Sequence, residues 1–215
     1  MIGANGANYM AMEFGGEGLK TLNMSDRIAI CNLCVEAGAK TALMEVDEIT
    51  LDYLKAHGRE PKHVFKSDED AHFAKVYEID LAAVRPIVAK PHFVDSVVDA
   101  KECVGTHIDE AFLGSCNNGR IEDLRVGAEL IKGRKVHPHV RFLVVPASTE
   151  VYRQALAEGI IDTFMEAGAI VMNANCSVCW GSCQGVIGEG EVLISTGTRN
   201  FKGRAGHKDS FVYLA

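Results

Sequence analysis

Hydrophobic and polar positions in the second half of the chain follow a regular rhythm of short apolar runs and longer amphipathic stretches. The apolar runs predict four strands, Ala111–Leu113, Arg141–Val145, Ala169–Met172 and Val192–Ser195. The amphipathic stretches predict three helices, Ile121–Lys132, Thr149–Glu158 and Ile160–Ala167, and glycines stand where they end. Strands that alternate with helices indicate an α/β fold with a mainly parallel sheet.

The first half of the chain has a weaker pattern. It predicts helices at residues 7–20, 25–37 and 47–57, and Gly38 and Gly58 end the last two. It also predicts strands at residues 41–46, 76–81 and 84–89. Residues 90–106 have little helical or strand periodicity. We therefore expect two α/β/α subdomains with mainly parallel sheets, residues 1–95 and 96–215.

The composition narrows the class of protein. Among 215 residues, 47% are hydrophobic and 24% are charged, which indicates a packed core. No run approaches the ~18 apolar residues of a membrane helix, and the first residues lack a signal-peptide pattern, so we expect a cytoplasmic protein without a membrane partner. The net charge of −7 argues against a nucleic-acid surface. Seven cysteines, an odd number, favour reduced thiols, several of which are available as ligands.

Three segments that carry cysteines or arginines each follow a predicted strand. The first carries Cys116, the second Cys176 and Cys179, and the third Arg199 and Arg204. Ligands of open α/β sheets collect beyond the carboxyl ends of the strands, so we expect these side chains to meet at one edge. Thiolates suit zinc or an iron–sulfur cluster, and arginines suit a carboxylate held by two hydrogen bonds.

Three thiolates leave one corner of a metal centre open unless Cys183 supplies a fourth. An open corner allows Lewis-acid catalysis on a hydroxyl group, and the arginines would hold a carboxylate of the same molecule. This arrangement predicts the dehydration of a hydroxy-acid. The alternative is a structural Cys-x-x-Cys with arginines in surface ion pairs. Asn32 and Glu36 share a helix face, which from spacing alone is usually solvated surface.

Several segments resemble one family, the aconitase superfamily, and are most similar to large subunits of 3-isopropylmalate dehydratase (isopropylmalate isomerase) and homoaconitase. The segments are Gly6–Gly16, Ser25–Ala39, Gly114–Leu124, Cys176–Cys179 and Thr198–Arg204. Two positions depart from the family's usual pattern: Asn117 stands where Thr is common, and Thr198 where Asn is usual.

The resemblance implies roles for individual residues. It implies that three cysteines bind a [4Fe–4S] cluster whose fourth iron binds substrate, namely Cys116, Cys176 and Cys179. It implies that Arg199 and Arg204 bind substrate carboxylates. Asn32 and Glu36 would line the cluster site and assist the hydroxyl group or a bound water. Cys183 and Cys34 match no ligand of the family.

The resemblance also implies parts outside this chain. Family members carry an N-terminal domain with active-site histidines, and a small subunit carries the swivelling domain with the catalytic serine. We therefore expect the central-to-C-terminal part of a larger enzyme, either an excised piece, a split gene or an inactive remnant. The expected reaction isomerises or dehydrates a malate-type hydroxy-acid, as in leucine biosynthesis, and homoaconitate or a methylated malate is an alternative substrate. An alternative of another class is a non-catalytic module that binds zinc through four thiols including Cys183.

Overall fold

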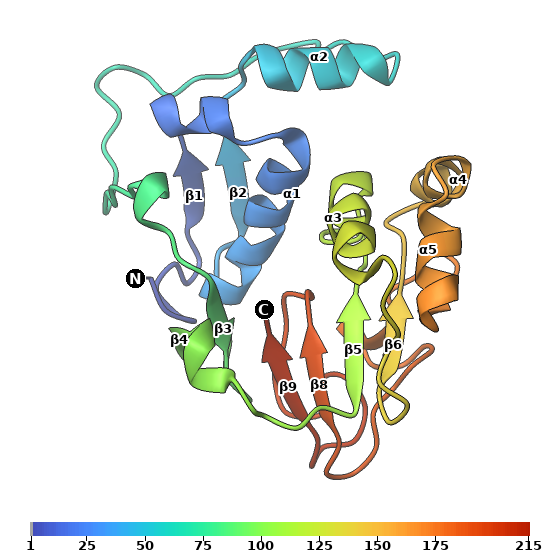
Figure 1. Ribbon diagram of the computed structural model, residues 1–215. Coiled ribbons are helices and arrows are strands. Elements are labelled where there is room, and N and C mark those ends of the chain that lie inside the picture. The colour runs from blue at the N-terminus through green and yellow to red at the C-terminus, as the bar shows by residue number, and fades with distance from the viewer. Residues whose placement is uncertain (1) are drawn as a thin grey trace. The chain divides into compact units, whose positions relative to one another are not determined.

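The computed structural model describes residues 2–215, which divide into two compact units, residues up to Arg85 and Pro86–Ala215. A seven-stranded sheet in the order β4-β3-β9-β8-β5-β6-β7 organises the second unit (Figure 1). Its strands are β3 (Ile87–Ala89), β4 (Val97–Asp99), β5 (Glu110–Leu113), β6 (Arg141–Val144), β7 (Ile170–Val171), β8 (Val192–Ser195) and β9 (Phe211–Leu214). The five strands from β9 to β7 pair in parallel, and β3 is antiparallel to β4 and β9. The expected α/β fold with a mainly parallel sheet is confirmed.

Side chains that alternate along the strands build a separate core on each face of this sheet, because successive residues of a strand point to opposite faces. Leu113 and Val144 belong to the core that the helices cover. These helices are α3 (Ile121–Ile131), α4 (Thr149–Ala157) and α5 (Ile160–Ala167). Phe112 and Leu143 belong to the other core. Residues from connecting segments complete that core: Val178, Ile187 and Ala205.

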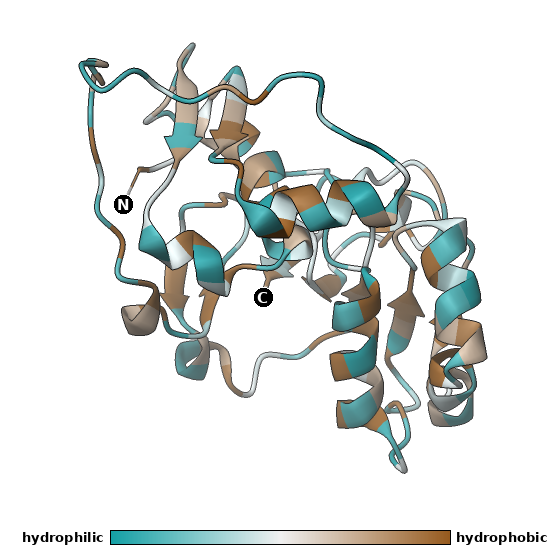
Figure 2. Cartoon of the chain, turned by 90° about the horizontal axis from the view of Figure 1, so that it is seen from above, coloured by the Kyte–Doolittle hydropathy of each residue, from teal (hydrophilic) through white to brown (hydrophobic). Residues whose placement is uncertain are grey.

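The helices of the second unit pack through one apolar stripe each. Leu124 of α3 and Phe164 of α5 are fully buried, and the ring of Phe142 meets that of Phe164 edge-on at 6.0 Å between centroids. Figure 2 shows hydrophilic and hydrophobic residues in alternation along the helices, as expected where only one stripe faces a core. Gly159 lies between α4 and α5 with φ 73°, a left-handed conformation that glycine adopts without a steric cost.

The first unit is smaller and has a two-stranded parallel sheet of β1 (Ala11–Phe14) and β2 (Thr41–Met44). Its helices are α1 (Met24–Leu33) and α2 (Glu48–Ala56). Short 3₁₀ turns complete the chain: Glu17–Thr21, Cys34–Ala37 and Leu81–Ala83 in this unit, and Ala100–Cys103 and Ser177–Cys179 in the second. A capping box between Asn23 and Asp26 begins α1.

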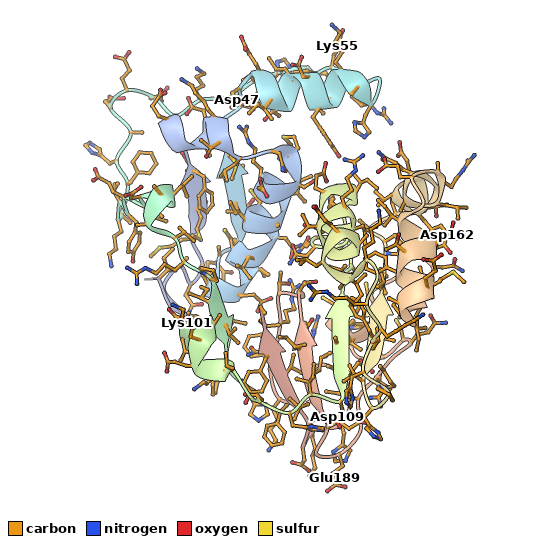
Figure 3. All side chains as sticks on the ribbon, viewed as in Figure 1. Asp47, Lys55, Lys101, Asp109, Asp162 and Glu189 are labelled. Atoms are coloured by element: carbon orange, nitrogen blue, oxygen red, sulfur yellow. The ribbon has the colours of Figure 1, made fainter. Side chains whose placement is uncertain are left out.

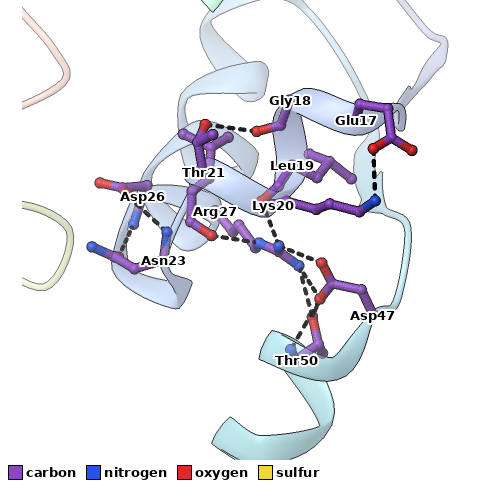
Figure 4. Close-up of polar contacts among 11 residues, drawn as sticks. Glu17, Gly18, Leu19, Lys20, Thr21, Asn23, Asp26, Arg27, Asp47 and Thr50 are labelled. Carbon is purple, nitrogen blue, oxygen red and sulfur yellow. Dashed lines mark hydrogen bonds and ion pairs between the residues drawn. The ribbon is translucent and has the colours of Figure 1, made fainter.

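Arg27 of α1 connects the elements of the first unit and is only 2% exposed (Figure 4). Its two terminal nitrogens each donate to one oxygen of Asp47 at 2.7 Å. It also donates to the carbonyls of Leu19 and Leu22 and to the hydroxyl of Thr50. This guanidinium lowers the pKa of Asp47 to about 2. One buried cation thus joins the 3₁₀ turn Glu17–Thr21, α1 and the start of α2.

Two expectations about the elements were wrong. Residues 7–20 contain β1 and a 3₁₀ turn in place of a helix, and residues 76–81 form no strand. The helix expected over residues 25–37 is present as α1 followed by a 3₁₀ turn that begins at Cys34, and Gly38 ends it as expected. The two compact units divide at Arg85, and β3 pairs with β4 and with β9 of the second unit. The boundary expected at residue 95 stays a prediction. No helix within residues 2–215 is long and apolar enough to cross a membrane.

Candidate functional site

A small pocket lies at the carboxyl ends of the parallel strands of the second unit. Strands β5, β6 and β8 all point toward this end of the sheet (Figure 1). The pocket is lined by Gly114, Ser115, Cys116, Asn117, Cys179, Gly197, Thr198 and Arg199. It therefore brings together Cys116, Cys179 and Arg199 from three different loops.

The loop that carries Cys116 is tied to the end of β8. The hydroxyl of Thr196 accepts from the backbone N–H of Gly114 at 3.0 Å and donates to the Gly114 carbonyl at 3.1 Å. The side-chain amide of Asn118 donates to the carbonyl of Thr196. Gly119 has no room for a side chain, since a Cβ there would lie 2.3 Å from the carbonyl oxygen of Val145. These contacts fix the loop that carries Cys116, whose side chain is exposed and lines the pocket.

The Cys176–Cys179 loop is anchored by the two residues between the cysteines. Ser177 is fully buried and Val178 is 2% exposed, with Val178 in the core of the second sheet face. The Ser177 hydroxyl donates to the carbonyl of Gln184 at 2.8 Å. Because Ser177 and Val178 turn inward, the thiols on either side remain accessible, with Cys176 exposed and Cys179 half-buried.

The two arginines approach the same site from the loop after β8. The Nε of Arg204 donates to the carbonyl of Cys179 at 2.8 Å, so Arg204 lies beside the second cysteine loop. Arg199 donates to the hydroxyl of Thr198 at 2.9 Å. Asn200, which is fully buried, donates from its side-chain amide to the carbonyl of Lys90 at 2.8 Å. This buried amide ties the arginine loop to the end of β3.

The neighbouring thiols of this site affect the pKa of Cys176. Partial desolvation, and then the thiolates of Cys116, Cys179 and Cys183, raise the pKa of the Cys176 thiol, while the charge of Arg204 opposes this rise. By contrast, burial raises the pKa of Cys34 to about 11, and Cys34 packs in the core of the first unit. Because its side chain is buried in that core, Cys34 is assigned as a core residue.

Three thiols of the second unit are candidate ligands of a metal centre. Within residues 2–215, no group of three or more His, Cys, Asp or Glu side chains converges closely enough to hold one metal ion. An iron–sulfur cluster has no such requirement, because each thiolate binds a separate iron atom. Cys116, Cys176 and Cys179 are the residues that could hold a cluster. Cys183 is a further exposed thiol, four residues after Cys179 in the sequence, and its charge contributes to the raised pKa of Cys176.

Asn32 and Glu36 belong to the first unit. Asn32 is exposed near the end of α1, and Glu36 is half-buried in the 3₁₀ turn that follows. The roles that the resemblance implies for Asn32 and Glu36 stay predictions.

A second group of charges lies at the amino ends of the strands, where Asp109 and Glu189 are labelled in Figure 3. Glu110 is fully buried at the start of β5 and accepts from Arg141 at 2.8 Å. Arg141 also holds Glu191 through two bonds of 2.8 and 2.7 Å. Burial raises the pKa of Glu110 to about 7, although Arg141 opposes this rise. This network lies at the end of the sheet away from the cysteines.

Sequence reasoning missed several residues that build the site. Thr196 and Asn200 hold the loops together, and Arg120 donates from its Nε to the carbonyl of Cys116 at 3.1 Å. A usable signal existed for Arg120, which stands four residues after Cys116 at the start of a predicted helix. None existed for Asn200, which donates to the carbonyls of Lys90 and Phe93, more than 100 residues away along the chain, and to that of Val212.

Comparison with known proteins covers the whole chain. The model of the aconitase family (aconitate hydratase) matches residues 1–107 and 99–215. A 3-isopropylmalate dehydratase large subunit from Caldicellulosiruptor saccharolyticus is 48% identical over 100% of this chain and 50% of its own length. A probable 3-isopropylmalate dehydratase large subunit and a probable methanogen homoaconitase large subunit, both from Methanothermobacter thermautotrophicus, are each 49% identical over 100% of this chain. These matches cover 51% and 50% of the two relatives. The chain thus spans about half the length of the curated relatives it matches, and it belongs to the aconitase family.

Proposed function

We propose that this chain is the cluster-bearing part of the large subunit of a hydro-lyase that acts on a malate-type hydroxy-acid. The observation that carries the proposal is the pocket at the strand ends, where Cys116 and Cys179 lie together with Arg199. Thiols that could hold a cluster and a cation that could hold a carboxylate thus face the same small space. The names of the relatives, 3-isopropylmalate dehydratase and homoaconitase, support this class of substrate.

In the proposed enzyme, Cys116, Cys176 and Cys179 hold a [4Fe–4S] cluster. When bound, the cluster supplies a Lewis-acidic iron for the hydroxyl group and one carboxylate of the substrate. Arg199 and Arg204 then bind the remaining carboxylate. Arg204 suits this task because its Nε already donates to the Cys179 carbonyl, which orients the two terminal nitrogens of the planar guanidinium.

The remaining acid–base chemistry is assigned to residues outside the pocket. Asn32 and Glu36 are proposed to line the cluster site and to assist the hydroxyl group or a bound water. The large-subunit names of the relatives support a small-subunit partner. A preference between 3-isopropylmalate and homoaconitate is proposed to depend on the remainder of the enzyme, because relatives of both names are 48–49% identical to this chain.

Cysteine variants test the proposed ligand set. The full chain is loaded anaerobically with iron and sulfide, and iron and acid-labile sulfide are then measured per chain. Cys116→Ser, Cys176→Ser and Cys179→Ser should each lose most of the iron, because each removes one of three ligands. Cys183→Ser is the matched control from the same loop and should keep the cluster. Dehydratase activity toward 3-isopropylmalate, measured with the small subunit and the remaining large-subunit domain added, should follow the iron content.

A second candidate function is a non-catalytic module that binds zinc through four thiols. The observation in its favour is the electrostatic coupling of Cys183 to Cys176, which suggests a fourth thiol close to the other three. Four-thiolate zinc sites have no open position and are structural. Stoichiometric zinc that is lost in Cys183→Ser, with no iron uptake by the unmodified chain, would favour this function over the hydro-lyase.

A further inference from the structure

Two arginines hold the backbone of two cysteine loops in the same way. The Nε of Arg204 donates to the carbonyl of Cys179 at 2.8 Å, and the Nε of Arg120 donates to the carbonyl of Cys116 at 3.1 Å. Arg204 comes from the loop after β8, whereas Arg120 begins α3, so the two contacts arise independently. In each case the Nε makes this hydrogen bond, and the two terminal nitrogens of the planar guanidinium do not take part in it.

Arg120 is itself held in place, which makes its contact to Cys116 a defined one. Its backbone N–H donates to the carboxylate of Asp123 at 2.9 Å, and its carbonyl accepts from Leu124 in the first turn of α3. The residue before it, Gly119, is packed against the carbonyl of Val145 without space for a side chain. The backbone of Arg120 is therefore fixed, and its side chain extends back to the carbonyl of Cys116.

We propose that Arg120 is a positioning residue of the cluster site and the counterpart of Arg204. Arg120 orients the turn that carries Cys116 and places a positive charge beside the cluster. This inference rests on the proposed function. Outer partners that orient a metal ligand typically affect metal affinity or activity by 10–100-fold. Hydrogen bonds and charges near a cluster also set its reduction potential. Arg120 is thus expected to influence both the retention and the potential of the cluster.

The test compares Arg120→Ala with Arg125→Ala in the full chain loaded anaerobically with iron and sulfide. Arg125 is the matched control, because it lies on the same helix and pairs with Glu158 through bonds of 2.8 and 2.6 Å. The rate of cluster loss in air is followed by absorbance, and the reduction potential by titration with a chemical reductant. Arg120→Ala should lose its cluster about 10-fold faster and have a more negative potential, because a nearby positive charge favours the reduced cluster.

Arg120→Lys separates charge from geometry. Lysine keeps the positive charge without the planar fork, so the potential should return toward that of the unmodified chain while cluster loss stays faster. Equal circular dichroism of all variants checks that α3 still forms. The proposal is overturned if Arg120→Ala matches Arg125→Ala, or if only the rate of loss changes while the potential does not. Failure of the unmodified chain to take up any cluster would instead refute the proposed function.

Discussion

Replacing the buried Glu110 by glutamine should remove most of the pH dependence of stability of the second unit near neutrality. Burial raises the pKa of this carboxyl from 4.5 to about 7, because Glu110 is fully enclosed and one of its oxygens has no hydrogen-bond partner within residues 2–215. The folded state therefore favours the protonated form. The stabilisation is fully present below pH 4.5 and is lost as the pH rises through 7.

The size of the effect follows from the same values. A rise in pKa from 4.5 to about 7 corresponds to about 3 kcal/mol between the two limits. The value of about 7 already includes the opposing effect of Arg141 at 2.8 Å, so a change of up to about 3 kcal/mol is expected as the pH rises from 5 to 8. Glutamine has the shape of the protonated carboxyl and does not ionise, so Glu110→Gln should be nearly insensitive to pH in this range apart from the histidines that both proteins share.

Urea unfolding measures this directly. Trp180 is the single tryptophan of the chain and lies in the second unit, so its fluorescence reports on that unit. The free energy of unfolding is determined at pH 5, 6, 7 and 8 for the unmodified chain, Glu110→Gln and Glu158→Gln. Glu158 is the control, because Arg125 lowers its pKa and its contribution is lost only in more acidic solution. If Glu110→Gln keeps the pH slope of the unmodified chain, the assignment of a buried, protonated carboxyl is refuted.

Two further changes test other parts of the structure. Asp47→Asn should destabilise the first unit by about 3 kcal/mol, because it removes the charge that balances Arg27, which is 2% exposed. Faster hydrogen exchange in α1 would show the effect, and an unchanged exchange rate would contradict it. Since the pKa of Asp47 is about 2, its stabilisation should persist above pH 4 and be lost as the pH falls toward 2. Gly181→Ala should lower the iron content, because its Cβ would lie 2.0 Å from the carbonyl oxygen of Arg204. Gly190→Ala is the control, since Gly190 has a similar φ of 75° with no atom within 4 Å, and it should cost about 1 kcal/mol with normal iron; equal iron content in both variants would contradict the close approach.

The elements that could be predicted from the sequence are those with local signals. Helices α3, α4 and α5 have amphipathic stripes and glycine ends, and they lie within a few residues of the expected ranges. The segment at residues 7–20 has no such signal: β1 is only four residues long and exists through its pairing with β2, about 30 residues further along the chain. Likewise β9 was not predicted, since its partners β8 and β3 define it.

The candidate site was predictable to the extent that it follows from topology. Parallel strands bring their carboxyl ends to one edge, so Cys116, Cys179 and Arg199 could be expected to meet, and they line one pocket. The residues that fix their positions are harder to predict. Arg120 has a local signal, because it stands four residues after Cys116 at the start of a predicted helix. Asn200 has none, because it donates to backbone carbonyls, which leave no signature in the sequence. The resemblance to the aconitase superfamily, found from the motifs themselves, agrees with the family membership of the whole chain.

Mössbauer spectroscopy of the ⁵⁷Fe-loaded chain tests the central claim most directly, namely that three cysteines hold a four-iron cluster with one open corner. We predict four irons per chain, with one iron that differs from the other three and whose signal shifts when 3-isopropylmalate is added to the assembled enzyme. Replacement of Cys183 by serine should leave this spectrum unchanged. Four irons with equivalent thiolate coordination and no response to the acid would contradict the account, as would a chain that binds only zinc.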